Sequence, residues 1–113
     1  MILQDLELIL AQADIPVAHY EITANQSLPY IVYQEIKTGY DYAGGRPIRE
    51  KITVMAMHFT SRRFDPSLEK LKEALHDARL FFSIDHDYDE SAKIVMGMFT
   101  ITLINDLESG DIF

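Results

Sequence analysis

The residues of this sequence that could do chemistry are acids, histidines and hydroxyl side chains, because the chain has no cysteine. The acids are densest in the segment DHDYDE, in which Asp85, Asp87 and Asp89 alternate. Alternating aspartates open calcium-binding loops, but such a loop also needs Gly at its sixth position and Glu at its twelfth. Glu90 and Met96 occupy those two positions here. The segment is therefore better explained as a solvated acidic turn than as a metal site.

The other candidate groups match no known catalytic or binding pattern. The four histidines lack the H-E-x-x-H and zinc-ligand spacings, and the segment AGGRP is neither a Walker loop nor a dinucleotide fingerprint. His58, on a strand, is better explained as a half-buried hydrogen-bonded residue than as a ligand. We therefore expect no catalytic residue, no metal and no cofactor, and we expect that the protein is not an enzyme. A small enzyme or a metal-binding module that uses the acidic turn stays open as an alternative.

Charge is distributed unevenly along the chain, whose formal net charge is −8. Residues 1–36 carry a net charge of −5, residues 37–79 carry +3, and residues 80–113 carry −6. An acidic chain repels nucleic acid, because phosphate binding depends on Lys and Arg. A basic middle between acidic ends would let copies of the protein meet head to tail, although solvated faces would give the same pattern.

The elements that must position these residues begin with a helix. Apolar residues recur at three- and four-residue spacing over residues 2–13, and Pro16 ends the helix near Asp14. A short extended segment, VAHYEI, follows. The apolar segment LPYIVYQE then predicts a strand over residues 29–36, with Pro29 at its start, where a missing N–H is tolerated.

A long loop is expected next, because residues 37–50 contain three glycines, a proline and several charges. We expect the part of this loop from Tyr40 to Arg49 to be mobile in an isolated subunit and to become ordered on assembly. Tyr40 and Tyr42 on the loop are candidates for a subunit interface, since aromatic residues are enriched in interfaces. Tyr30 and Tyr33, on the preceding strand, are expected in the core.

Residues 50–60 predict a central strand, because alternate positions are apolar on both faces. A helix follows, with Asp65 as its cap and Pro66 in its first turn. Residues 81–84 predict a short strand before the acidic turn. Residues 92–104 predict the last and longest strand, in which Gly97 marks a bulge or a close approach of the backbone.

Two helices and four to five strands predict a single α+β domain over residues 1–113, with a mostly antiparallel or mixed sheet. Residues 105–113 are expected to form a polar, mobile tail. The N-terminus has no basic start and no long apolar run, so neither a signal peptide nor a membrane span is expected.

Several segments together resemble a known group of proteins. These are a helix ending in DIPVAHYEI, the strand LPYIVYQE, a glycine-containing loop, the segment ITVMAMHFTSRRFDPSLEKLKEAL and a long final strand. They resemble the small neck and tail-completion proteins, of the tail terminator type, from tailed phages and prophages of Gram-positive bacteria. The resemblance covers about residues 5–104.

The resemblance implies a virion structural protein that forms a homo-oligomeric ring, with six subunits expected, at the head-proximal end of the tail tube. The implied partners are further copies of the chain, the major tail tube protein and the head–tail connector proteins. DNA would pass through without specific binding, and the protein would lie in the host cytoplasm during assembly and then in the neck of the virion. A head-closure or adaptor protein is the alternative. The residues expected at the subunit interface are aromatic or basic: Tyr40, Tyr42, Arg46, Arg49, Arg62 and Arg63.

Overall fold

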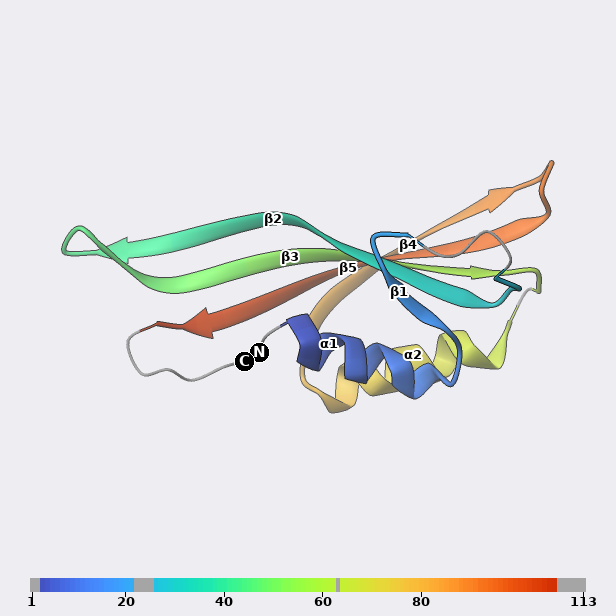
Figure 1. The fold of residues 1–113 in the computed structure, drawn as a ribbon, viewed down its shortest axis with the longest axis horizontal. Coiled ribbons are helices and arrows are strands. Elements are labelled where there is room, and N and C mark those ends of the chain that lie inside the picture. The colour runs from blue at the N-terminus through green and yellow to red at the C-terminus, as the bar shows by residue number, and fades with distance from the viewer. Residues whose placement is uncertain (1–2, 22–25, 63, 108–113) are drawn as a thin grey trace.

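The computed structural model describes residues 3–21, 26–62 and 64–107, which form one α+β domain (Figure 1). The elements in chain order are α1 (Leu3–Leu10), η1 (Ala11–Ala13), β1 (Val17–His19), β2 (Tyr30–Ala43), β3 (Arg46–Thr60), α2 (Pro66–Asp77), β4 (Phe81–Asp89) and β5 (Ile94–Asp106). The strands form one sheet in the order β1-β2-β3-β5-β4. β1 runs parallel to β2, and all other neighbours are antiparallel. The predicted fold class is confirmed.

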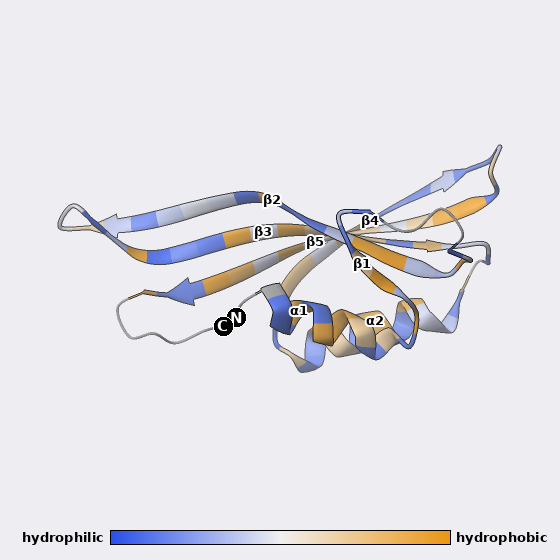
Figure 2. Ribbon diagram, viewed as in Figure 1, coloured by the Kyte–Doolittle hydropathy of each residue, from blue (hydrophilic) through white to orange (hydrophobic). Residues whose placement is uncertain are grey.

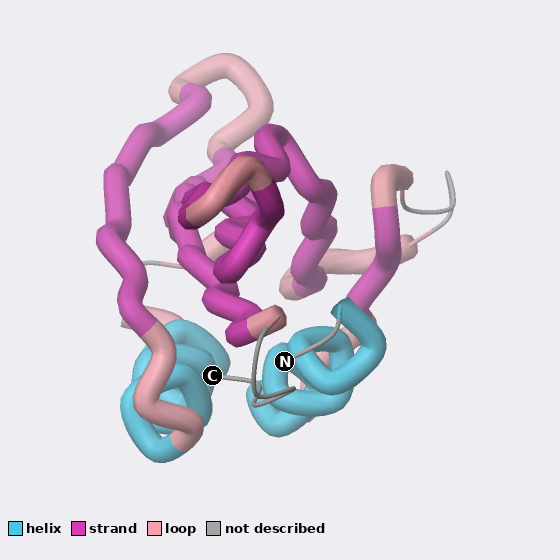
Figure 3. Tube along the Cα trace, turned by 90° about the vertical axis from the view of Figure 1, so that its left-hand side faces the viewer, coloured by secondary structure: helices cyan, strands magenta, loops and turns pink. Residues whose placement is uncertain are grey.

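Both helices lie on the same side of the sheet, as the view along the molecule shows (Figure 3). The core lies between the two layers, where leucines of the helices pack on apolar side chains of β2, β3 and β5. Its largest fully buried side chains are Phe99, Leu6, Leu10, Ile31, Leu71, Leu75, Ile101, Leu103, His58 and Val54. Fully burying one such aliphatic side chain contributes about 1.5–3 kcal/mol, so this layer supplies most of the stability of the fold. β3 is the central strand, as predicted.

The helix boundaries follow from local sequence signals. η1 extends α1 and is followed by Asp14, which has a left-handed φ of 61°. Pro16 then keeps Ile15 out of the helical conformation. α2 begins after Asp65, whose side chain accepts a hydrogen bond from the backbone N–H of Ser67 at 2.9 Å. Both predicted helix ends are confirmed.

The long loop expected over residues 37–50 is wrong. This segment continues β2 and β3 as an antiparallel ladder, and only Gly44 and Gly45 connect the two strands. Both glycines have positive φ, of 60° and 78°, as in the two-residue type I′ turns that suit the twist of a hairpin. The glycine and charge content that indicated a loop instead belongs to a tight turn and to solvent-exposed strands.

The acidic turn expected over residues 85–90 is also wrong. β4 runs from Phe81 to Asp89, so the short strand predicted over residues 81–84 continues through the aspartates. The turn that joins β4 to β5 follows at residues 90–93. Polar residues can occupy this strand because β4 is at the edge of the sheet and most of its side chains are exposed to solvent.

Gly97 causes no bulge, because the pairing of β5 with β3 and with β4 continues through it without a register shift. A Cβ atom at this position would lie 3.6 Å from Cδ1 of Leu68 and 3.9 Å from Cβ of His58. These are ordinary van der Waals distances, so the packing of α2 on the sheet does not require a glycine here. Of the predicted polar tail, Asn105 and Asp106 belong to β5, and residues 108–113 lie outside the described part of the chain.

Candidate assembly surfaces

The outer part of the β2–β3 hairpin, residues 37–51, projects beyond the two helices (Figure 1). We call it the arm. It accounts for much of the elongation of the molecule, whose dimensions are 53 × 25 × 23 Å. Two register shifts interrupt the ladder. The shift at Ile36 lies between the body and the arm, and the shift at Ile48 lies within the arm, next to its tip. Hydrophilic residues dominate the arm, whereas hydrophobic residues dominate the body (Figure 2).

The arm carries polar pairs across its two strands. The hydroxyl of Tyr40 donates to Glu50 at 3.1 Å, and this hydrogen bond raises the pKa of Tyr40. The carboxylate of Asp41 lies 3.4 Å from both Arg49 and Lys51. Exposed ion pairs of this kind contribute only about 0–1 kcal/mol each, so they fix the register of the arm more than they stabilise the protein.

The structure brings four of the six predicted interface residues together on the arm. Tyr40 and Tyr42 are both exposed and their ring centroids lie 6.4 Å apart, while Arg46 and Arg49 are exposed on the facing strand. Arg62 instead lies beyond the other end of β3, beside Asp65 at 3.4 Å. Arg63, also predicted at the interface, lies outside the described residues.

The sheet has a second face, opposite the helices, which we call the open face. Side chains alternate between the two faces along each strand, so every second side chain lies on the open face. The registers of β2, β3, β4 and β5 show which residues of neighbouring strands share this face. The apolar ones are Tyr30, Val32, Met55, Met57, Phe59, Phe81, Ile94, Met96, Met98 and Ile104, of which Val32 is buried and Phe81 is exposed. The methionines are only partly buried, and no helix among the described residues covers them. The four methionines therefore lie on a face that no helix of the described residues covers, and the sequence had indicated only that β3 has two apolar faces.

A row of carboxylates borders the open face along β4. Asp85 pairs in register with Met98 and Asp87 with Met96, so these aspartates and Asp89 share the face of the methionines. His86 and Tyr88 point to the opposite side. The alternation of DHDYD, with a period of two residues, is the sequence signal that could have identified this strand.

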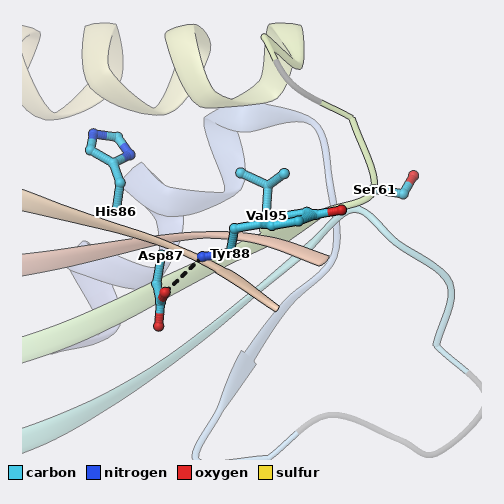
Figure 4. Close-up of a pocket in the computed structure, with 5 residues that line it drawn as sticks. All are labelled: Ser61, His86, Asp87, Tyr88 and Val95. Carbon is cyan, nitrogen blue, oxygen red and sulfur yellow. Dashed lines mark hydrogen bonds between the residues drawn. The ribbon is translucent and has the colours of Figure 1, made fainter. Parts of the chain in front are cut away.

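An open hollow of about 750 Å³ lies where the β4–β5 hairpin extends beyond the start of α2. Its lining residues are Ser61, His86, Asp87, Tyr88 and Val95 (Figure 4). His86 and Val95 point to the helix side of the sheet, whereas the carboxylate of Asp87 points to the other side. Asp87 accepts a hydrogen bond from the backbone N–H of Tyr88 at 2.8 Å. The hollow thus gathers no convergent pair of acid and base groups.

His58, Ser67 and Asp65 form a buried network that contains the residue types of a catalytic triad in a different order. The hydroxyl of Ser67 donates to Asp65 at 2.6 Å, and it therefore accepts from Nε2 of His58 at 2.7 Å. In a triad the histidine stands between the serine and the carboxylate, so that it can take the hydroxyl proton. Here the serine stands between, and all three residues are at least 94% buried. The network holds the start of α2 on β3 and activates no nucleophile.

The same network shifts two pKa values downward. Burial lowers the pKa of His58, and the charge of Asp65 only partly opposes this effect. Burial tends to raise the pKa of Asp65, but the hydrogen bonds from Ser67, Thr60 and Arg62 prevail and lower it to about 2. His58 is thus satisfied by a hydrogen bond, as expected, and it is more deeply buried than expected.

A second cluster fastens β1 to β2 near the surface. Nε2 of His19 lies 3.0 Å from the carboxylate of Glu35, which also accepts a hydrogen bond from Tyr20 at 2.7 Å. The ring of His19 stacks on Tyr20 and on Tyr33. Tyr33 is buried, as predicted for the core, and donates to Glu7 of α1. These contacts connect secondary-structure elements and do not surround a cavity.

Within residues 3–21, 26–62 and 64–107, no three acidic or histidine side chains converge as metal ligands would. In the same residues, no helix has the length and apolar character needed to cross a membrane. Comparison with protein-family models and with curated proteins yields no match to this chain.

Proposed function

We propose that this chain is a structural protein of a tailed phage or prophage, a tail terminator or tail-completion protein that works as a homo-oligomeric ring between tail and head. The observation that carries the proposal is the open face, an apolar methionine-rich surface beside a projecting arm. The position of the ring between tail and head is inferred from the sequence resemblance, and self-association is inferred from the open face and the arm.

The open face favours assembly because a sheet with two apolar faces needs a second layer. Contiguous apolar patches are uncommon on monomers and usually mark interaction sites. Methionine is enriched in protein interfaces, and its flexible thioether adapts to the partner surface. The rows Tyr30–Phe59–Met96 and Val32–Met57–Met98 run across three strands, and all of these side chains except the buried Val32 are partly exposed, so the patch extends across β2, β3 and β5. A neighbouring subunit would cover it in a ring.

The charge of the protein suits a ring around DNA. A net charge of −8 repels phosphate, so DNA could pass through without being held. A structural protein also needs no catalytic group, and the buried network of His58, Ser67 and Asp65 is a helix-capping arrangement. A small metal-binding module is disfavoured, because Asp85, Asp87 and Asp89 lie along one extended strand and do not converge.

The proposal predicts that the purified protein self-associates and that the open face carries the association. Replacing Met57 and Met98 with Gln should weaken association at least about tenfold, because each methionine buried in an interface is worth about 1.5–3 kcal/mol. The mass in solution, measured by light scattering with and without purified tail tubes, checks this. Leu8→Gln, which changes an exposed residue of α1, is the control.

A protein that stays monomeric at all concentrations and does not bind tail tubes would contradict the proposal. Binding to head connectors without binding to tail tubes would instead favour the head-closure or adaptor alternative. Unchanged association of the Met57→Gln/Met98→Gln variant would show that the open face does not carry the association.

A further inference from the structure

We infer that the arm of one subunit lies across the open face of the next, with its basic side chains against the carboxylates of β4. This inference rests on the proposed self-association and names the surfaces that meet.

The two surfaces lie at different places along the molecule, so one subunit cannot join them by itself. The tip of the arm is at one end of the long axis, and the β4–β5 hairpin is at the other end (Figure 1). Ala43, at the tip, pairs with Arg46, while Ser83 of β4 is in register through Thr100 with Met55. Nine residues of β3 separate Arg46 from Met55, which corresponds to about 30 Å. The contact must therefore form between subunits, and such a head-to-tail contact repeats into a ring when its rotation closes.

The charges of the two surfaces are complementary. Lys37, Arg49 and Lys51 lie on one side of the arm together with Asp41, and Asp106 of β5 pairs with Arg49 on the same side, which leaves a net charge of +1. The open face carries the three aspartates of β4 and thus a charge of −3 along one border. Arg and Lys also have long apolar stems that can cover the methionines while their charged groups reach the carboxylates.

Packing of two open faces on each other is the other way to cover this surface. When the two β4 strands lie against each other with their acidic ends aligned, this packing brings two rows of three aspartates together, and like charges at short distance repel. The arm avoids this repulsion. Its seven residues of β2, from residue 37 to residue 43, span about 23 Å, which exceeds the about 13 Å from Met55 to Phe59. The arm is therefore long enough to cross the apolar patch.

Cysteine cross-linking tests the inference directly, because the natural chain has no cysteine. The variant Ala43→Cys/Ser83→Cys places one thiol at the arm tip and one on the open face, at exposed positions that the inference does not use for binding. A disulfide requires Cα atoms within about 7 Å, so the two cysteines of one subunit cannot pair. Oxidation, or a short bis-maleimide, should give a ladder of covalent multimers on a denaturing gel.

The matched control is Ala43→Cys/Glu69→Cys, in which the second thiol lies exposed on α2. This control should form no ladder of multimers, and its cross-linked species should be only those that Ala43→Cys alone or Glu69→Cys alone also forms. An oligomer that light scattering detects but that Ala43→Cys/Ser83→Cys does not cross-link would overturn the inference and leave the proposed ring intact. Dimers formed by Ser83→Cys alone would favour face-to-face packing and overturn it as well. A monomer under all conditions would overturn both proposals.

Charge exchange gives a second readout. Arg49→Glu/Lys51→Glu should shift the oligomer toward monomer, and the further changes Asp85→Lys/Asp87→Lys in the same chain should restore assembly. Restoration is specific to a direct contact, since a merely misfolded arm would stay dissociated. Failure of the exchange to restore assembly, in chains whose circular dichroism is unchanged, would contradict the contact.

Discussion

At the scale of single residues, Asp65 has the most demanding role. Its carboxylate caps α2 through the backbone of Ser67 and accepts hydrogen bonds from the hydroxyls of Ser67 and Thr60. Arg62 lies 3.4 Å away and is mostly exposed. Because the acceptor is charged and nearly buried, each donor would be left unsatisfied without it. The network is therefore a cooperative element of the fold, which Ser67 extends to His58.

Asp65 should make stability depend on acid pH. Its folded pKa of about 2 is below the ordinary value of 3.8, so its contribution is complete above about pH 4 and is lost as the pH falls toward 2. Asp65→Ala should lower the free energy of unfolding by about 1–3 kcal/mol at pH 7, because both the cap and the buried acceptor are removed. Urea unfolding at pH 7 and at pH 3 measures both effects.

Asp65→Asn is the matched control, because it keeps a capping oxygen but does not titrate. Its stability should change less between pH 4 and pH 2 than that of the wild type. Equal pH dependence of the two proteins in this range would show that other carboxylates account for the acid sensitivity.

At the scale of elements, the arm is a hairpin whose register depends on its turn. The two glycines at its tip have positive φ, which other residues adopt only with strain. The body of the sheet is held by the core, whereas the arm has cross-strand hydrogen bonds and exposed pairs. The arm should therefore respond to its turn almost independently of the body.

Gly45→Val should disturb the arm by about 1–2 kcal/mol, since a β-branched side chain is poorly accommodated at a φ of 78°. Amide hydrogen exchange should become faster over residues 37–51 and stay unchanged in α2 and in the core strands. Gly39→Ala is the control, because a Cβ at Gly39 would meet no atom within 4 Å. Equal exchange in both variants would mean that the turn does not determine the order of the arm.

At the scale of the whole molecule, charge is separated along the long axis, but part of it is neutralised within the subunit. The basic arm and the acidic end of β4 are at opposite ends. Lys70 of α2, in contrast, pairs with Asp14 at 3.2 Å and so joins the basic middle of the chain to its acidic start. The charge blocks of the sequence are therefore only partly available for contacts between subunits.

The structure changes the choice of residues for a charge-reversal test. Reversal of Arg62 would place a carboxylate beside the buried Asp65 and disturb folding, so Arg62 is unsuitable. Arg46→Glu/Arg49→Glu on the arm should instead weaken assembly, and added salt should weaken the unmutated assembly in the same direction. Each exposed pair contributes only about 0.2–1 kcal/mol, but every interface of a ring repeats it.

Sedimentation of the variant, compared with Lys70→Glu/Lys72→Glu on α2, measures this effect at equal net charge. Unchanged sedimentation of the arm variant, together with insensitivity to salt, would mean that apolar packing on the open face carries the assembly alone.

The sequence by itself determined the features that depend on neighbouring residues. The spacing of leucines and the Asp65–Pro66 pair specify α2, Pro16 specifies the end of the first helix, and alternation with two apolar faces specifies β3 as the central strand. These signals are local, because helix capping, proline geometry and side-chain alternation act within a few residues.

Only the tertiary structure decided the features that depend on strand pairing. Residues 37–50 and 85–89 have the composition of loops, yet a neighbouring strand supplies their backbone hydrogen bonds and makes them strands. Strand pairing likewise placed the aspartates of β4 beside Met96 and Met98, and it placed Met98 beside Met57, which is distant in sequence. It also separated Arg62 from the arm. Contacts between distant residues are set by register, and register is fixed by the packing of the entire sheet on its helices.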